Sequence, residues 1–211
     1  MNIHSVARNS DIAQLLLDSA VSLFAERTYE GTQMPAVAQR AGVGVGSIYR
    51  YFPSKEALGN AAFQYAKRGL LDRLTAALAP DGGSGEVGGS GGAPSVREEF
   101  GRLWLGFTRY AGEHHDAFVF LEHQQHDTFL APESLALSAE VDGFAREFIE
   151  RGQRAGEIRD GDARQLVALA IGAFTGLVKH LRPGGIAQLS PEALATAEDA
   201  VWDLLHRKAT S

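Results

Sequence analysis

A predicted helix over residues 46–52 carries side chains suited to hydrogen bonding and charge. Ile48 and Phe52, four residues apart, give this helix one apolar face. The other faces carry hydroxyl, phenol and guanidinium groups, from Ser47, Tyr49 and Tyr51, and Arg50. Such groups bind phosphate oxygens and the edges of bases. This pattern therefore indicates an outward surface for a polar partner.

A second predicted helix precedes this surface and must position it. Its apolar residues follow the i, i+3, i+4, i+7 spacing of one helical face, namely Met34, Val37, Ala38 and Ala41. We expect Thr32 to cap the helix, Pro35 to lie in its first turn and Gly42 to end it in a left-handed conformation. Two helices joined by such a turn predict a helix-turn-helix whose second helix enters a DNA major groove. The alternative is a helical hairpin whose tyrosines cover a core.

The run from Leu15 to Leu58 contains the pattern A-x-x-A-G-V-x-x-G-S-I-Y-x-Y-F-x-S-K-E-A-L. It resembles the N-terminal domain of the TetR family of bacterial transcriptional regulators, over the first third of the chain. The resemblance implies an all-α fold of about nine helices, with a helix-turn-helix domain joined to a helical ligand-binding and dimerisation domain. Gly44 and Val45 depart from the family, which often has a serine and a polar or basic residue there. The departure predicts a weaker cap and an apolar base contact.

With this resemblance we expect double-stranded DNA to be bound by residues Thr32, Gln33, Val45, Gly46, Ser47, Tyr49, Arg50, Tyr51 and Lys55. Lys55 follows Ser54, the predicted N-cap of a fourth helix. A lysine in a first helical turn is unfavourable, because its charge has the same sign as the positive end of the helix dipole. A DNA phosphate at this place would be attracted by the helix N-terminus and by the lysine ammonium. We therefore predict that Lys55 holds a phosphate. The alternative is a surface lysine without a partner.

The charge is distributed unevenly between the N-terminal part of the chain and the remainder. The whole sequence has a formal charge of −6. Residues 1–73 contain 8 Lys and Arg against 6 Asp and Glu, a net of +2, which leaves −8 for residues 74–211. Phosphate contact is therefore expected in the N-terminal part, while the acidic remainder would be repelled by DNA.

Composition and motifs exclude several other classes. The sequence has no cysteine, which rules out disulfides and thiolate metal sites and fits a cytoplasmic location. Its longest apolar stretch, residues 166–178, is broken by glycines and is too short for a membrane span. There is no G-x-S-x-G, P-loop or other catalytic motif. We expect no enzyme activity, no cofactor and no membrane partner.

Apolar spacing predicts the remaining elements. A first helix begins at Asn9 or Ser10, after an unpatterned arm, and carries a stripe formed by Ile12, Leu15, Leu16, Ala20, Leu23 and Phe24. It ends near Arg27, before a turn at Gly31. We expect a helix-turn-helix domain over residues 1–53, a connecting helix over 54–79, a flexible Gly/Ser-rich loop over 80–95 and an effector-binding and dimerisation domain over 96–211. Helices in this last domain are predicted over residues 96–112, 117–126, 132–154, 163–181 and 191–208.

Two functions are expected of the C-terminal domain. The helix over 163–181 is apolar around much of its girth, with Gly172 and Gly176 four residues apart, and the family pairs its last two helices into a homodimer. A small-molecule effector, apolar or aromatic, would occupy a pocket formed by Trp104, Phe107, Tyr110, Phe118, Glu122, His123, His126, Phe144 and Phe174. The histidine spacing also makes a metal site conceivable, but no ligand motif supports one and we predict none.

These observations predict a ligand-responsive regulator, most simply a repressor that binds a palindromic operator as a dimer. The alternative is a helical small-molecule or metal-binding protein whose helix-turn-helix is purely structural.

Overall fold

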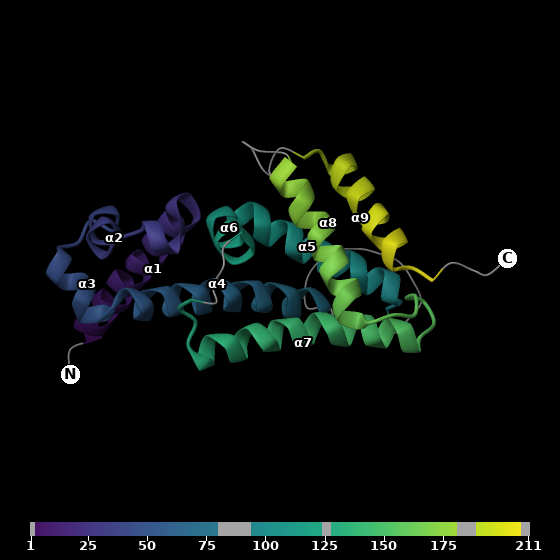
Figure 1. The fold of residues 1–211 in the computed structure, drawn as a ribbon, viewed down its shortest axis with the longest axis horizontal. Coiled ribbons are helices and arrows are strands. Elements are labelled where there is room, and N and C mark those ends of the chain that lie inside the picture. Colours follow the sequence, from purple (N-terminus) through teal and green to yellow (C-terminus); the bar gives the residue numbers. More distant parts are fainter. Residues whose placement is uncertain (1–2, 80–93, 124–127, 181–188, 208–211) are drawn as a thin grey trace. The chain divides into compact units, whose positions relative to one another are not determined.

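The computed structural model describes residues 3–79, 94–123, 128–180 and 189–207, and these residues form an all-helical fold, as predicted (Figure 1). Nine helices lie within this part of the chain. They are α1 (Ile3–Gly31), α2 (Met34–Arg40), α3 (Val45–Tyr51), α4 (Lys55–Leu78), α5 (Val96–Glu113), α6 (His115–His123), α7 (Pro132–Arg154), α8 (Ala163–His180) and α9 (Pro191–Leu205).

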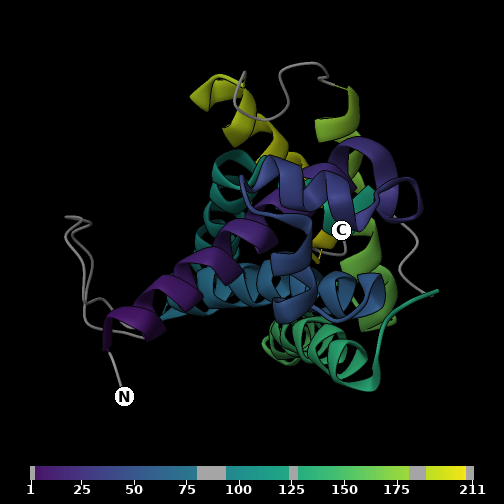
Figure 2. The ribbon, with the colours of Figure 1, turned by 90° about the vertical axis from the view of Figure 1, so that its left-hand side faces the viewer.

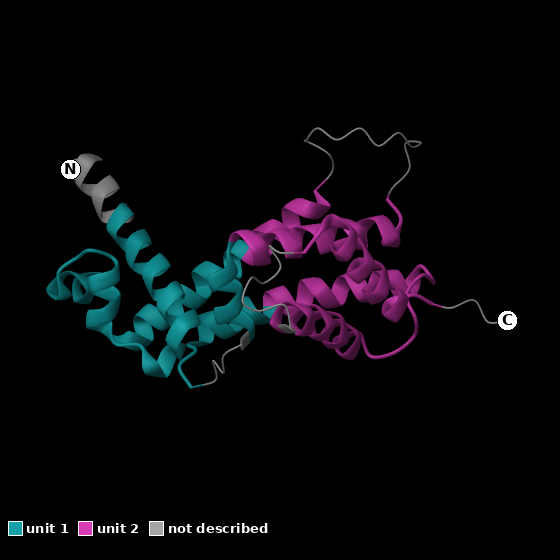
Figure 3. Cartoon of the chain, turned by 90° about the horizontal axis from the view of Figure 1, so that it is seen from above, with its two compact units in different colours: residues 1–69, 114–139 teal, residues 70–113, 140–211 magenta. Residues whose placement is uncertain are grey.

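The helices form two compact units (Figure 3). Unit 1 comprises residues 1–69 and 114–139, and unit 2 comprises residues 70–113 and 140–211. Residues 114–123 and 128–139, which lie within the predicted effector domain, therefore pack with the N-terminal helices. Helix α4 contributes its first part to unit 1 and its last part to unit 2.

Unit 1 has a core built on α1. Leu16, Ala20, Leu23 and Phe24 are all almost fully buried, as predicted. Leu15 is 50 % exposed, so its predicted place in the core is wrong. The buried positions 16, 20, 23 and 24 define one helical face, and residue 15 lies behind it. The ring of Phe24 packs against Phe120 of α6, with 5.3 Å between centroids.

The start of α1 also differs from the prediction. The helix begins at Ile3, so residues 3–9 are helical rather than an unpatterned arm. This segment contains neither glycine nor proline, and nothing in it breaks the helix. At the other end the break falls at Thr28, where φ is 68° and ψ is 164°, so the predicted end near Arg27 is confirmed, whereas the predicted break at Gly31 is wrong. A threonine with positive φ is strained, so the surrounding contacts must hold this turn in place.

Unit 2 has an aromatic core contributed by α5, α7, α8 and α9. Phe100 of α5 lies within 6.5 Å, between ring centroids, of Phe148 and within 5.3 Å of Trp202. Trp104, one turn further along α5, packs edge-to-face on Phe174 of α8. The guanidinium of Arg97 covers one side of this cluster and pairs with Glu198 and Asp199 of α9.

Helix α5 begins with a capping box that our loop boundary missed. Ser95 accepts a hydrogen bond from the Glu98 N–H, while the Glu98 carboxylate accepts from the Ser95 N–H at 2.8 Å. Hydrogen bonds donated by the Ser95 N–H and by the Ser95 hydroxyl lower the pKa of the Glu98 carboxyl. Ser95 is therefore a helix cap, and the predicted flexible loop over 80–95 reaches too far. Residues 80–93 of that prediction lie outside the described residues.

Several predicted helix boundaries are confirmed and others move. Helix α7 has the predicted bounds, and Ser190 caps α9 by accepting from Ala193 N–H at 3.3 Å. Helix α6 starts at His115, two residues early, and residues 124–126 of its prediction lie outside the described residues. Helix α9 ends at Leu205, not Lys208. Its last carbonyl accepts from Arg159 N–H at 2.9 Å, and the chain then pairs with residues 157–158 in a short bridge.

Candidate nucleic-acid interface

The turn between α2 and α3 has the geometry expected of a helix-turn-helix. Gly42 adopts φ of 68°, and Val43 N–H returns to Ala38 O at 2.9 Å, closing the end of α2. The inner faces of both helices are buried, through Met34, Val37 and Ala38 of α2 and Ile48 of α3. Phe52, predicted inside the second helix, is instead its half-buried C-cap residue and donates its N–H to Ile48 O.

The outer face of α3 carries the predicted polar and aromatic side chains. Val45 is 45 % exposed and Tyr49 is 48 % exposed, and Gly46 and Arg50 are also exposed. Ser47 and Tyr51 are half-buried, and the Arg50 guanidinium lies 5.3 Å from the centre of the Tyr51 ring. Gln33, at the start of α2, is exposed as well. Figure 2 views the molecule from the end where α2 and α3 lie. These residues share a single helix-turn-helix unit and most of them reach its surface.

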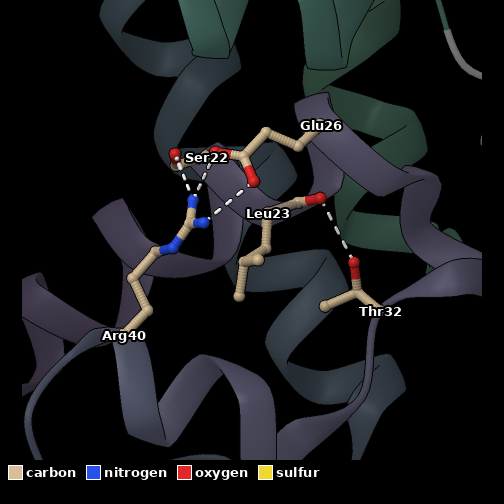
Figure 4. A network of polar contacts seen from close by, with 5 residues as sticks. All are labelled: Ser22, Leu23, Glu26, Thr32 and Arg40. Atoms are coloured by element: carbon tan, nitrogen blue, oxygen red, sulfur yellow. Dashed lines mark hydrogen bonds and ion pairs between the residues drawn. The ribbon is translucent and has the colours of Figure 1, made fainter.

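Thr32 has a different role from the one predicted. Its side chain is only 2 % exposed, and its hydroxyl lies 2.8 Å from Thr28 O. The same hydroxyl lies 3.2 Å from Leu23 O, a hydrogen bond drawn in Figure 4. The N-cap of α2 is Gln33, without a side-chain cap. The N-cap prediction for Thr32 is therefore wrong, because its hydroxyl is occupied by α1 carbonyls. The Thr32 side chain is buried within unit 1, where its hydroxyl stabilises the strained turn at Thr28.

An ion pair that the sequence did not indicate anchors α2 to α1. The Arg40 guanidinium donates to the two Glu26 carboxylate oxygens at 2.6 and 2.8 Å and to Ser22 Oγ at 2.8 Å (Figure 4). The hydrogen bond from Arg40 lowers the pKa of the Glu26 carboxyl. This bidentate contact fixes the orientation of α2, and through the tight turn that of α3. Arg40 and Glu26 are 14 residues apart on separate helices, so no local spacing reveals the pair.

Lys55 has partners within unit 1, which excludes the alternative of a lysine without any. Its ammonium donates to Glu30 O at 3.1 Å and lies 4.6 Å from the centre of the Tyr29 ring. Helix α4 starts at Lys55, with Ser54 Oγ accepting from Ala57 N–H as predicted. An ammonium has three donors, and the Glu30 carbonyl uses one of them. Lys55 thus joins the start of α4 to the end of α1, and its predicted phosphate contact stays a prediction.

The segment between α6 and α7 is tied to the same place. The Phe129 ring stacks on Tyr29 at 3.9 Å between centroids. Asn60 of α4 donates to Phe129 O at 2.8 Å and accepts from Ala131 N–H and the Ser134 hydroxyl, both at 2.7 Å. We call residues 128–131 the connector. The connector is therefore held by α1 and α4, and Tyr29 contacts both its Phe129 ring and the Lys55 ammonium.

The predicted effector residues are divided between the two units. Phe118 and Glu122 belong to unit 1, while Trp104, Phe107, Tyr110, Phe144 and Phe174 belong to unit 2. The Phe174 ring packs on two of them, with 5.3 Å between centroids to Trp104 and 4.7 Å to Phe107. Phe144 instead lines a separate hollow of about 550 Å³ between α4 and α7. The side chain of His123 and all of His126 lie outside the described residues.

Among the residues that the structure describes, no group of three metal-ligating side chains is close enough to hold an ion. In the same part of the chain, no helix combines the length and apolar character needed to cross a membrane.

Two family models match the sequence. The model for bacterial regulatory proteins of the tetR family matches residues 16–62, and the model for the tetracyclin repressor-like C-terminal domain matches residues 89–207. The second match alone covers more than half of the chain. The chain therefore belongs to the tetR family of bacterial transcriptional regulators.

Individual relatives agree with this membership. The HTH-type transcriptional repressor KstR of Rhodococcus jostii is 55 % identical over 40 residues, which are 19 % of each chain. The chain thus spans about a fifth of the length of the KstR proteins that it matches.

Solved structures extend the likeness to the whole fold. A TetR family transcription regulator from Marinobacter aquaeolei superposes with a TM-score of 0.79 at 20 % identity, covering 96 % of this chain and 99 % of that one. The ketosteroid transcriptional regulator KstR2 of Mycobacterium tuberculosis superposes with a TM-score of 0.69 at 19 % identity, covering 93 % of this chain and 95 % of that one. At such identities the likeness concerns the fold.

Proposed function

We propose that this chain is a ligand-responsive transcriptional repressor that binds a palindromic DNA operator as a homodimer. The observation that carries the proposal is the outer face of α3. A helix buried through Ile48 presents Val45, Tyr49 and Arg50 to the outside, in a helix-turn-helix of this family. A helix presented in this way can lie in a major groove with its side chains on base edges and phosphates.

The residues of this surface suit two kinds of contact. We assign base contacts to Val45, Ser47 and Arg50, since an arginine can read guanine and an apolar side chain can meet a thymine methyl group. Phosphate contacts are assigned to Gln33, Tyr49, Tyr51 and Lys55, and Gly46 allows the backbone to approach the DNA. Thr32 is left out because its side chain is buried.

Lys55 has a structural contact and a proposed DNA contact, and the two can be separated. A Lys55→Met variant removes the ammonium but keeps most of the apolar stem. If a phosphate contact is lost, the slope of log affinity against log salt concentration should become less steep by about one unit. If Lys55 only supports the end of α1, the variant should be less stable while the salt dependence stays that of the wild type.

The homodimer is proposed to form through α8 and α9. On α8, Leu169 is 54 % exposed, and a Cβ added at Gly172 or Gly176 would meet no atom within 4 Å. Packing within the chain therefore does not require these glycines, whereas close approach of a second helix would. A two-fold dimer would present two α3 helices to half-sites one helical turn apart, about 34–36 Å.

The effector is proposed to bind in unit 2 among Trp104, Phe107 and Phe174, and to be apolar or aromatic. Its effect on DNA requires an element that responds to the ligand and touches the DNA-binding helices. Helix α4 suits this role, because it starts at Lys55 in unit 1 and its last part belongs to unit 2, as the effector residues do. By linkage, a ligand that lowers the affinity for the operator requires that the operator lower the affinity for the ligand by the same factor, typically 5- to 150-fold.

Selection from a pool of random double-stranded DNA tests the proposal. The wild-type chain should enrich an inverted repeat with half-sites one helical turn apart, and binding to it should weaken steeply with salt. Failure to enrich any sequence would favour the alternative, a helical small-molecule or metal-binding protein whose helix-turn-helix is purely structural.

A further inference from the structure

The aromatic core of unit 2 contains one indole whose polar edge has no evident structural use. Trp104 is 7 % exposed. Its ring meets Phe174 edge-to-face, at 5.3 Å between centroids and 85° between planes, and lies 6.2 Å from Phe100. The aromatic cluster around this part of α5 combines Phe100 and Phe107 of α5 itself with one ring from each of α7, α8 and α9, namely Phe148, Phe174 and Trp202.

The indole N–H of Trp104 is buried, and no acceptor in the described part of the chain lies within hydrogen-bond distance of it. The neighbouring buried hydroxyl of Thr108 differs, because it donates to Leu105 O at 3.1 Å within its own helix. Buried indole N–H groups usually have a partner, since leaving one without an acceptor is unfavourable. A phenylalanine could fill an apolar core without this cost. Packing alone therefore does not account for a tryptophan here.

The missing partner has a definite chemistry. An indole N–H is a donor only, so it requires an acceptor atom. A carboxylate or phosphate would bring a full charge into an apolar core, and one N–H does not compensate for its lost hydration. A hydroxyl or amine would bring a donor hydrogen that needs an acceptor of its own. A carbonyl oxygen is neutral and only accepts, so it matches a single N–H among aromatic rings.

We infer that the effector is a neutral, mainly apolar molecule with a carbonyl oxygen that accepts a hydrogen bond from Trp104 Nε1. This inference rests on the proposed function, in which the same aromatic group binds the effector, and it makes Trp104 the residue that selects for the carbonyl. Phe107 and Phe174 would contact the apolar body of the ligand. Hydrocarbons of the same shape would lack the acceptor and bind less tightly.

Two probes that differ only at this atom test the inference. Benzophenone carries the carbonyl, and diphenylmethane has a methylene group in its place. The chain contains two tryptophans, so an ¹⁵N-labelled sample gives two indole N–H signals, and Trp104→Phe identifies the one from Trp104. Benzophenone should move this indole proton downfield, and diphenylmethane should not. By calorimetry, benzophenone should bind the wild type about three- to tenfold more tightly, and Trp104→Phe should bind both probes equally.

Equal affinity of the two probes for the wild type would overturn the inference, as would an unmoved indole signal with benzophenone bound. Failure of both probes to bind would also overturn the assigned ligand class. The wild-type measurements do not depend on the folding of the variant. Binding of benzophenone without release of the selected DNA would leave the role of Trp104 intact and would contradict ligand-responsive repression instead.

Discussion

Replacing Gly59 with alanine should destabilise unit 1, although the same change in an open helix position would stabilise it. Gly59 lies in α4 beneath the stacked rings of Tyr29 and Phe129. An added Cβ would lie 2.6 Å from Tyr29 Cε2 and 3.0 Å from Phe129 Cε2. Both side chains are only 8 % exposed, so neither ring can move away without disturbing its neighbours. The stack must open or α4 must shift.

The expected magnitude follows from two opposing effects. Alanine is favoured over glycine in a helix by about 1 kcal/mol. Forcing an extra methyl group into a packed core costs about 1–3 kcal/mol. For Gly59→Ala we therefore expect a net loss of about 1 kcal/mol in the free energy of unfolding. Gly143→Ala in α7 is the matched control, since its Cβ would meet nothing within 4 Å. That variant should gain about 1 kcal/mol.

Urea unfolding followed by circular dichroism measures both variants against the wild type, with the midpoints compared at equal slope. The two should differ by about 2 kcal/mol, in opposite directions from the wild type. A Gly59→Ala protein as stable as Gly143→Ala would show that the rings yield freely. The connector would then not be held firmly by Tyr29.

Three further outcomes are expected. Because Arg40 lowers the pKa of Glu26, their ion pair stabilises the fold above the ordinary glutamate pKa and loses this effect as pH falls through the lowered value. Melting temperatures of wild type and Glu26→Gln should thus differ at neutral pH and converge in acid, and a difference independent of pH would contradict this. Gly44→Ser should stabilise α3 by a few tenths of a kcal/mol in urea unfolding, since the N-cap lacks a side-chain acceptor and a Cβ there has space. Replacing both Gly172 and Gly176 with alanine should raise helix stability but weaken the dimer in sedimentation velocity, and an unchanged dimer would remove α8 from the interface.

Local signals predicted much of the fold. The bounds of α7, the positive φ of Gly42 and the cap at Ser190 depend on residues within one or two turns of each other, so spacing and residue type suffice to find them. The same holds for the exposed face of α3 and its buried Ile48. The capping box at Ser95 and Glu98 was also visible as S-x-x-E, but the surrounding glycine-rich composition concealed it.

Contacts between residues distant in the sequence could not be predicted in this way. The Arg40 and Glu26 pair, the stacking of Tyr29 on Phe129 and the partners of Lys55 each join separate elements. Nothing in the periodicity of one helix specifies the residues that another helix brings to it. The same limit explains why segment 114–139 was placed with the effector domain, because its packing on α1 depends on tertiary contacts.

Operator binding by a variant of the α3 surface tests the central claim most directly. Arg50→Ala removes an exposed side chain assigned to a base contact, and Arg109→Ala removes an exposed arginine of α5 as a control of equal charge. In fluorescence anisotropy with the selected DNA, Arg50→Ala should cost about 1–3 kcal/mol of binding free energy and relax the base preference at one position of each half-site. Arg109→Ala should bind as the wild type does. Equal binding and equal sequence preference for wild type, Arg50→Ala and Arg109→Ala would contradict the assignment of α3 as the DNA-reading helix.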